Sequence, residues 1–366
     1  MTFDVGVSNG SSGVQVICYY GSWRSYTTCK IEEINATLCT ILIYAFAQIH
    51  ENGTLKPLDE WADIRLDGYR RFTALKKRNP RLKTMLGVGG GSEGSEKYSK
   101  MVATSASRAV FIESVLGYMQ KYGFDGVDLD WEYPTRRGGR LEDRENLSEL
   151  LKEMRIEFDR HNYLMTMSVV PNDASIDTFY EVPQLSKYLD HILMMMYNMH
   201  SPTSGRTGHN APLQSSNRYN VEYSTKAWVR KGGTPAMLIL GIPAYGRSFT
   251  LADPGSHGIG APSVGLGLPG PYSRANGTLY HYEVLHFQKA LGWTREWSEE
   301  QQVPYSYYRD QWVGYDDAES VRRKVEFARK LNLGGVMMWT IDQDDPRGLT
   351  GEKFPLLNVI NNEYAN

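Results

Sequence analysis

The sequence has little net charge and no long apolar run, and both deficits exclude classes of function. Its 366 residues include 40 Lys and Arg against 42 Asp and Glu, a formal net charge of −2 at pH 7. A nearly balanced charge gives no electrostatic case for binding nucleic acid or an anionic membrane surface. No stretch of the sequence approaches the roughly 20 apolar residues that a membrane-spanning helix requires. We therefore expect neither nucleic acid nor a membrane as a partner.

Cysteine is also scarce, and all three cysteines, Cys18, Cys29 and Cys39, lie in the first forty residues. Their spacings of 11 and 10 residues do not match those of structural zinc sites, so zinc is a weak alternative. An odd number leaves one cysteine over if a disulfide forms. We expect a Cys18–Cys39 bridge joining the first two strands, and the pattern assigns no role to Cys29. No metal or cofactor is expected.

The start of the sequence, residues 1–13, is polar and lacks the apolar core of a signal peptide. It is consistent with a cytosolic chain or with a mature form that was given a new Met. Asn-x-Ser/Thr sequons favour the second interpretation, and with it a secreted, extracellular protein. The five sequon asparagines are Asn9, Asn35, Asn52, Asn146 and Asn276. We expect a monomer.

Short β-rich runs alternate with amphipathic helical patterns along most of the chain. The eight runs are Val14–Tyr20, Thr40–Gln48, Lys83–Gly89, Gly126–Asp130, Leu164–Val170, His191–Tyr197, Met237–Pro243 and Gly335–Thr340. The helical patterns include Arg108–Tyr122, Asn146–His161 and Ser320–Leu331. This alternation predicts an α/β fold, a (β/α)₈ TIM barrel with its function at the carboxyl ends of the strands. A doubly wound sheet is the alternative, but no Gly-rich dinucleotide-binding motif follows the first run.

The seventh and eighth runs are separated by about ninety residues, far more than an ordinary connection. The segment between them is rich in Gly, Tyr and short turn signals. It predicts a small inserted α+β subdomain that forms one wall of a cleft. A disordered lid is the alternative, but the Trp and Tyr content favours packing. The predicted boundaries are 14–246 and 313–360 for the barrel and 247–312 for the insertion.

Three acidic residues alternate along the fourth run, in the sequence DGVDLDWE at 125–132. Side chains two positions apart on a strand share a face, so Asp128, Asp130 and Glu132 point the same way. The apolar residues between them point the other way, toward the surrounding helices. The acidic row therefore faces the barrel interior, with Glu132 at its open mouth.

Three inward carboxyl groups cannot all ionise at low cost, so at least one proton should be shared among them. Such a row lowers stability, and it is useful where it tunes an acid. A cation site is the competing functional interpretation, since carboxylates bind hard cations. A solvated acidic face is the structural alternative. We favour a catalytic row over both.

The run at 125–132 closely resembles the signature of glycoside hydrolase family 18, which contains chitinases and catalytically inactive chitin-binding lectins. The likeness extends from Val16 to about Gly348. Further motifs that match in order are CYY with Trp23 at 18–23, YAFA at 44–47, GVGG at 87–90, MMYN at 195–198, GIPAYGR at 241–247, WVGYDD at 312–317 and GGVMMW at 334–339.

The resemblance implies a chitinase that cleaves β-1,4-linked N-acetylglucosamine polymers by a substrate-assisted retaining mechanism. Glu132 would protonate the glycosidic oxygen, and the substrate's own N-acetyl carbonyl would attack the anomeric carbon to give an oxazolinium ion. Asp130 would orient the acetamido group and help tune Glu132, with Asp128 beneath it as a charge partner. Tyr197 would hydrogen-bond the acetamido oxygen as charge develops.

The resemblance also implies a set of residues that bind chitin or chitooligosaccharides. Trp339 would form the floor of the cleft, and Trp23 would stack on a sugar. Arg247 could instead only pair with an acid of the inserted segment. The complete set is Tyr19, Trp23, Phe46, Gly90, Gly91, Tyr133, Met195, Asn198, Tyr245, Arg247 and Trp339.

The sequence departs from the family pattern at three positions. Asn198 stands in place of the usual Asp and brings no negative charge, so we expect a changed pH profile near the acid limb. Gly91 and Thr203 stand where many animal members carry Trp, both on the expected leaving-group side. Losing two stacking platforms predicts weaker binding of the reducing-end extension.

Other functions remain open at this point. A chitin-binding lectin is the main alternative to an enzyme, and such relatives usually lack the acid at the position of Glu132. An endo-β-N-acetylglucosaminidase acting on N-glycans shares the acid motif but usually resembles this animal-type pattern less fully. A growth-factor-like or allergen-like role, in which catalysis is incidental, is also compatible with the sequence.

Overall fold

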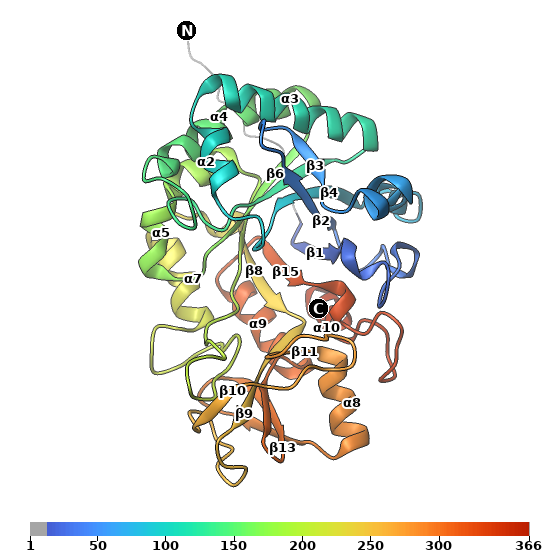
Figure 1. Ribbon diagram of the computed structural model, residues 1–366, viewed down its shortest axis with the longest axis vertical. Helices are drawn as coiled ribbons and strands as arrows, with labels where there is room; N and C mark the ends of the chain where they lie inside the picture. The colour runs from blue at the N-terminus through green and yellow to red at the C-terminus, as the bar shows by residue number, and fades with distance from the viewer. Residues whose placement is uncertain (1–12, 366) are drawn as a thin grey trace.

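The computed structural model describes residues 13–365, whose centre is a closed barrel of eight parallel strands (Figure 1). The barrel strands are β1 (Gln15–Gly21), β2 (Ile41–Ile49), β4 (Lys83–Gly89), β5 (Gly126–Asp130), β6 (Leu164–Val169), β7 (His191–Met194), β8 (Leu238–Pro243) and β15 (Gly335–Trp339). They pair in the order β1-β15-β8-β7-β6-β5-β4-β2, and pairing of β1 with β2 closes the barrel. A short strand, β3 (Leu55–Pro57), adds to β2 in antiparallel fashion. The predicted (β/α)₈ barrel is confirmed.

Helices lie between successive strands and around the barrel (Figure 1). The α-helices of this part are α1 (Gly68–Thr73), α2 (Glu96–Val102), α3 (Ser105–Tyr122), α4 (Asp143–His161), α5 (Asp173–Phe179), α6 (Val182–Tyr188), α7 (Val221–Arg230), α9 (Ala318–Lys330) and α10 (Pro355–Ala365). The capping residues explain why α3 and α9 begin earlier than the apolar pattern predicts. Oγ1 of Thr104 accepts from Ser107 N at 3.1 Å, and Oδ1 of Asp317 accepts from Ser320 N at 3.0 Å. These bonds satisfy amides that the first helical turn leaves unpaired.

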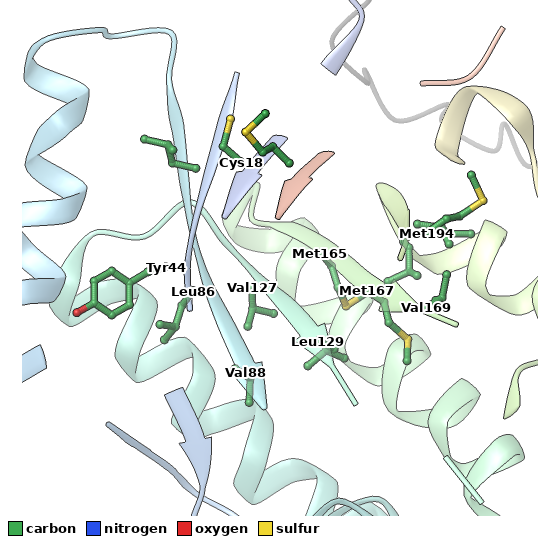
Figure 2. Packing of buried hydrophobic residues seen from close by; sticks show 14 of the residues in the cluster. Cys18, Tyr44, Leu86, Val88, Val127, Leu129, Met165, Met167, Val169 and Met194 are labelled. Carbon is green, nitrogen blue, oxygen red and sulfur yellow. The ribbon is translucent and has the colours of Figure 1, made fainter. Parts of the chain in front are cut away.

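The barrel strands bury side chains on both faces, which gives the molecule an inner and an outer core. The inner core fills the barrel with residues such as Ile17, Ile43 and Met337. The outer core lies between the strands and the helices, where Val127 and Leu129 pack with residues of neighbouring strands (Figure 2). Burying a side chain of this size stabilises the fold by about 1.5–3 kcal/mol relative to leaving it exposed.

One predicted strand is too long by three residues. The run His191–Tyr197 continues as a strand only to Met194. Beyond that point Met196 N donates to Met194 O at 2.8 Å and Tyr197 N donates to Met195 O at 2.7 Å. These tight local bonds turn the chain out of the barrel wall, because the same amides can no longer pair with a neighbouring strand. The turn brings the side chains of Met195, Tyr197 and Asn198 to the barrel mouth, whereas Met196 packs in the outer core.

A second sheet occupies the segment between β8 and β15, below the barrel in Figure 1. Its strands pair in the order β10-β9-β14-β13-β12, with β11 also on β9. They are β9 (Tyr245–Leu251), β10 (Ser263–Leu266), β11 (Thr278–Tyr280), β12 (Thr294–Ser298), β13 (Val303–Tyr308) and β14 (Gln311–Gly314), accompanied by helix α8 (His281–Leu291). Phe249, Tyr305 and Trp312 pack together in this sheet, so the segment has a small core of its own.

The cysteines follow the expected pairing. Cys18 and Cys39 form a disulfide between β1 and the segment that leads into β2, while Cys29 is free and buried. Of the sequon asparagines, Asn35, Asn52 and Asn276 are exposed, and Asn146 is half-buried on α4. Asn9 and nearly all of the polar start, residues 1–12, lie outside the described residues. Within residues 13–365 none of the helices has the length and apolar character to cross a membrane.

Candidate active site

The carboxyl ends of the barrel strands open into a cleft of about 710 Å³. Asp130 and Glu132 enter it from the end of β5, and Trp339 enters from the end of β15. Tyr245 and Arg247, on β9 of the second sheet, form part of its wall. The cleft therefore lies where the barrel mouth meets the inserted segment, at the strand ends where a barrel of this type carries its function.

Asp128 lies at the bottom of the acidic row, inside the barrel and without solvent exposure. Its carboxyl group accepts from the Tyr19 hydroxyl at 2.6 Å and from the Thr166 hydroxyl at 2.7 Å. Burial raises the pKa of Asp128 to about 6, although both hydrogen bonds oppose the shift. Both oxygens of the Asp128 carboxyl group accept a hydrogen bond, and the group is shielded from solvent. It can therefore affect the cleft only through its neighbours.

Asp130 and Glu132 form the upper part of the row and line the cleft. Burial raises the pKa of Asp130 well above its usual range, and the neighbouring charges of Glu132 and Asp128 raise it further. Burial also raises the pKa of Glu132, while a hydrogen bond from Tyr133 and the charge of Arg137 oppose that rise. Each of the two carboxyl groups therefore holds its proton to a higher pH than an ordinary carboxyl group does.

Oδ1 of Asp130 has no hydrogen-bond partner among residues 13–365 although it is buried. A buried acceptor without a partner costs about 1–3 kcal/mol. The atom belongs to a residue that lines the cleft, so a bound molecule could supply the missing donor. A buried, unpaired acceptor of this kind suits a ligand that carries an N–H or O–H group.

The segment after β7 forms a second polar wall together with β9. The Tyr245 hydroxyl donates to Oδ1 of Asn198 at 2.9 Å, and Nε of Arg247 donates to the same oxygen at 2.9 Å. Tyr197 lies beside Tyr245, with their ring centroids 6.0 Å apart. Burial raises the pKa of Tyr197 well above its usual range, so its hydroxyl stays protonated and can donate.

Three aromatic rings also line the cleft, in a row. The rings of Trp339 and Phe46 stack at 5.9 Å between centroids, and those of Phe46 and Trp23 stack at 6.2 Å. Trp23 is 36% exposed. Planar rings arranged this way offer flat apolar faces on which the apolar faces of sugar rings can stack.

Most of the residues expected from the sequence lie at this cleft. The lining residues among them are Trp23, Phe46, Gly91, Asp130, Glu132, Tyr133, Met195, Tyr197, Asn198, Tyr245, Arg247 and Trp339. Asp128, Tyr19 and Gly90 are not lining residues. Tyr19 instead supports Asp128 from inside the barrel. A Cβ atom at Gly90 would lie only 2.6 Å from Cε2 of Phe46, so this glycine makes room for the ring.

Sequence reasoning missed several residues that line the cleft. They are Leu58, Ser92, Val170, Pro171, Asn172, Thr278 and Gln343. Val170, Pro171 and Asn172 directly follow β6, so the rule that barrel strand ends carry function could have found them. Thr278 comes from β11, whose place beside the cleft depends on the fold of the insertion. Thr203, expected on the leaving-group side, does not line the cleft.

Arg137 is another residue that the sequence did not point to. Its Nη1 donates to the backbone oxygen of Glu132 at 3.1 Å, and its Nη2 donates to the carbonyl oxygen of Gly91 at 2.6 Å. The guanidinium therefore ties together two cleft residues that follow β5 and β4. Its charge also lowers the pKa of the Glu132 carboxyl group against the larger effect of burial.

Several known proteins are similar to this chain in sequence and fold. The family model described as glycosyl hydrolases family 18 matches residues 15–344. Chitotriosidase-1 of Mus musculus is 36% identical over 96% of this chain and 78% of its own length. The structure of the Ostrinia furnacalis group IV chitinase in complex with allosamidin is 41% identical, covers 96% of this chain and 99% of its own, and gives a TM-score of 0.94. Human YKL-39, described as a pseudo-chitinase with retained chitooligosaccharide binding, is 34% identical over 97% of this chain and 100% of its own, with a TM-score of 0.89.

Proposed function

The chain belongs to glycosyl hydrolase family 18, and from this premise we propose that it is a chitinase that uses Glu132 as its general acid and base. One observation carries the proposal: the carboxyl groups of Asp128 and Asp130, which are buried, and of Glu132, which is half-buried, form a row that ends in the cleft. The raised pKa of Glu132 suits a group that must donate a proton near neutral pH.

In the proposed first step, the Glu132 carboxyl group donates its proton to the glycosidic oxygen, and the bond from that oxygen to the anomeric carbon breaks. The carbonyl oxygen of the substrate's own acetamido group forms the new bond to the anomeric carbon, giving an oxazolinium ion. The leaving sugar departs with a new hydroxyl group. No enzyme carboxylate becomes bonded to the sugar, unlike the common two-carboxylate scheme.

In the second step, the ionised Glu132 takes a proton from a water molecule, whose oxygen attacks the anomeric carbon from the side of the departed sugar. The oxazolinium ring opens, and the product keeps its β configuration. Asp130 is suited to accept from the acetamido N–H, because its Oδ1 lacks a partner among the described residues. Tyr197 is suited to donate its hydroxyl to the acetamido oxygen as charge develops.

Substrate binding is proposed to use both sides of the cleft. The aromatic row of Trp23, Phe46 and Trp339 would stack on successive sugars. The inserted segment, residues 247–312, would act as a subdomain that contributes Arg247 and Thr278 to the opposite wall. We propose a secreted, monomeric enzyme, which the Cys18–Cys39 disulfide and the exposed sequons support.

A chitin-binding lectin is the second candidate, because a pseudo-chitinase is among the similar structures. Glu132 favours the enzyme, since an acid is present at the place where the proposed proton transfer needs one.

The test is hydrolysis of a chitin tetramer by the wild type and by Glu132→Gln, with products and their anomers followed over time. We expect rapid release of β-anomeric dimers by the wild type and none by the variant. Glu113→Gln, an exposed change on α3, is the matched control and should retain activity. A wild type that binds the tetramer and leaves it intact would establish the lectin instead.

A further inference from the structure

The guanidinium group of Arg247 lies on the cleft wall without an acidic partner. It donates from Nε and Nη2 to Oδ1 of Asn198 at 2.9 and 2.7 Å, and from Nη1 to Oγ1 of Thr278 at 2.7 Å. Both acceptors are neutral, and within residues 13–365 no carboxylate forms an ion pair with Arg247. Since arginine remains protonated at any working pH, this wall carries a positive charge that nothing beside it neutralises.

The amide of Asn198 is held through its oxygen, so its nitrogen remains for a ligand. Oδ1 accepts from the Tyr245 hydroxyl at 2.9 Å in addition to the two bonds from Arg247. Because three donors surround this atom, it must be the amide oxygen, which accepts hydrogen bonds. The amide nitrogen is itself a donor and could not accept them. Nδ2 has no hydrogen-bond partner in the described part of the chain, and the side chain is exposed in the cleft.

A buried residue holds this wall in place. Oδ1 of Asn210 accepts from the backbone N of Asn198 at 3.0 Å, and Nδ2 of Asn210 donates to the backbone oxygen of Tyr245 at 3.0 Å. Asn210 is without solvent exposure. The donors on the wall are therefore fixed by a buried bridge between the segment after β7 and β9, and they cannot simply turn away from an unfavourable ligand.

The carboxyl groups of the same cleft supply little compensating charge. Burial raises the pKa of both Asp130 and Glu132, so the pair retains protons at pH values where ordinary carboxyl groups are ionised. The side of the cleft formed by Asn198 and Arg247 thus presents hydrogen-bond donors and a positive charge, and no acceptor of comparable strength.

We propose that Asn198 and Arg247 make the cleft disfavour protonated amino sugars more strongly than an aspartate at position 198 would, a specificity that rests on the proposed chitinase function. The donors of the wall suit hydroxyl and acetamido carbonyl oxygens. A glucosamine unit instead carries an ammonium group, which meets a like charge at this wall. An aspartate at position 198 would neutralise Arg247 and accept from the ammonium group, whereas the Asn198 amide does neither. Partly deacetylated polymer should therefore bind less well to this chain than to Asn198→Asp.

The experiment measures binding of two tetramers, one of N-acetylglucosamine and one of glucosamine, by titration calorimetry at low salt. All proteins carry Glu132→Gln, so that neither ligand is consumed. We expect Asn198→Asp in this background to improve the affinity for the glucosamine tetramer, relative to the acetylated one, by about three- to tenfold. The improvement should shrink at high salt, because exposed charges are screened. Arg247→Gln, which removes the cation, should change the ratio in the same direction.

Asn362→Asp is the matched control, because it adds the same charge at an exposed position on α10, away from the cleft. It should leave the ratio of the two affinities unchanged. An unchanged ratio in both cleft variants, or a change as large in the control, would overturn the specificity while leaving the chitinase proposal intact. Failure of the acetylated tetramer to bind any of the proteins would overturn both.

Discussion

Tyr19 and Asp128 meet inside the barrel, where the tyrosine hydroxyl donates to a carboxylate oxygen at 2.6 Å. The two residues are 109 positions apart in the sequence, and neither has solvent exposure. Their contact links β1 to β5 beneath the proposed catalytic carboxyl groups. The same hydroxyl lies 2.7 Å from Oγ of Ser168, so β6 joins the contact.

Tyr19→Phe should destabilise the protein, and more so at neutral than at acid pH. The hydrogen bond from Tyr19 favours the ionised form of Asp128, so its loss raises a pKa that burial already holds near 6. A carboxyl group with a raised pKa binds its proton more tightly in the folded state, so it lowers stability as pH rises from about 4 through the folded pKa. We expect a loss of about 1–3 kcal/mol at pH 7.5 and a smaller one at pH 4.5, measured by urea unfolding.

Tyr26→Phe is the control for this change. Its hydroxyl also donates to a carboxylate, that of Asp59 at 2.7 Å, but Tyr26 is 52% exposed. Water can replace that bond, so its removal should cost well under 1 kcal/mol at either pH. If the two variants lost equal amounts of stability, burial of the Tyr19–Asp128 hydrogen bond would not be the reason for the effect of Tyr19→Phe.

Arg137→Gln should move the basic limb of the kcat profile to higher pH. The Arg137 charge lowers the pKa of the Glu132 carboxyl group, and its removal lets that pKa rise. Because protonated Glu132 is the proposed acid, activity should then persist to higher pH, by a few tenths of a unit for an exposed charge. Arg136→Gln removes a neighbouring exposed charge as a control. A basic limb that stays in place, or that moves equally in both variants, would refute the effect.

Asn198→Asp should move the acid limb of the kcat/KM profile to higher pH. A carboxylate added to the cleft disfavours ionisation of Asp130 and Glu132, so the pair would lose its proton only at higher pH. The native Asn198 therefore extends activity toward acid pH. Rates on the acetylated tetramer between pH 3 and 8 would measure the shift. A profile identical to that of the wild type would show that position 198 does not sense these acids.

Asn210→Ala should reduce kcat by tenfold or more and also destabilise the fold. The asparagine bridges the backbones of Asn198 and Tyr245, so its loss frees the wall next to Tyr197. Leaving these buried groups unpaired should cost about 1–3 kcal/mol. KM should change less than kcat, because the aromatic row remains in place.

Asn220→Ala provides a matched comparison for that variant. Asn220 is also buried, but it caps α7 by accepting from Tyr223 N at 2.8 Å. Its loss should cost about 1 kcal/mol of stability and leave kcat unchanged. If kcat fell equally in both variants, Asn210 would have only a structural role.

Local patterns in the sequence were sufficient to predict the barrel and the acidic row. Alternation of side chains along a strand is a local property, so it placed Asp128, Asp130 and Glu132 on one face before any contact was known. The other seven predicted strands lie within one residue of the observed ones, because β-rich runs depend on near neighbours. The predicted end of the strand that begins at His191 was wrong, since two short-range backbone hydrogen bonds turn the chain beyond Met194.

Contacts between distant segments were decided by the tertiary structure alone. Arg247 meets Asn198 across 49 residues and Gly91 meets Arg137 across 46, and no local periodicity encodes either pair. The pKa values of the acidic row depend on burial, which exists only once helices and strands enclose it. The sequence by itself thus determined which residues could carry the chemistry. Folding decided which of them have raised pKa values, which face the cleft and which charges remain without a partner, because those properties depend on distance and exclusion of water.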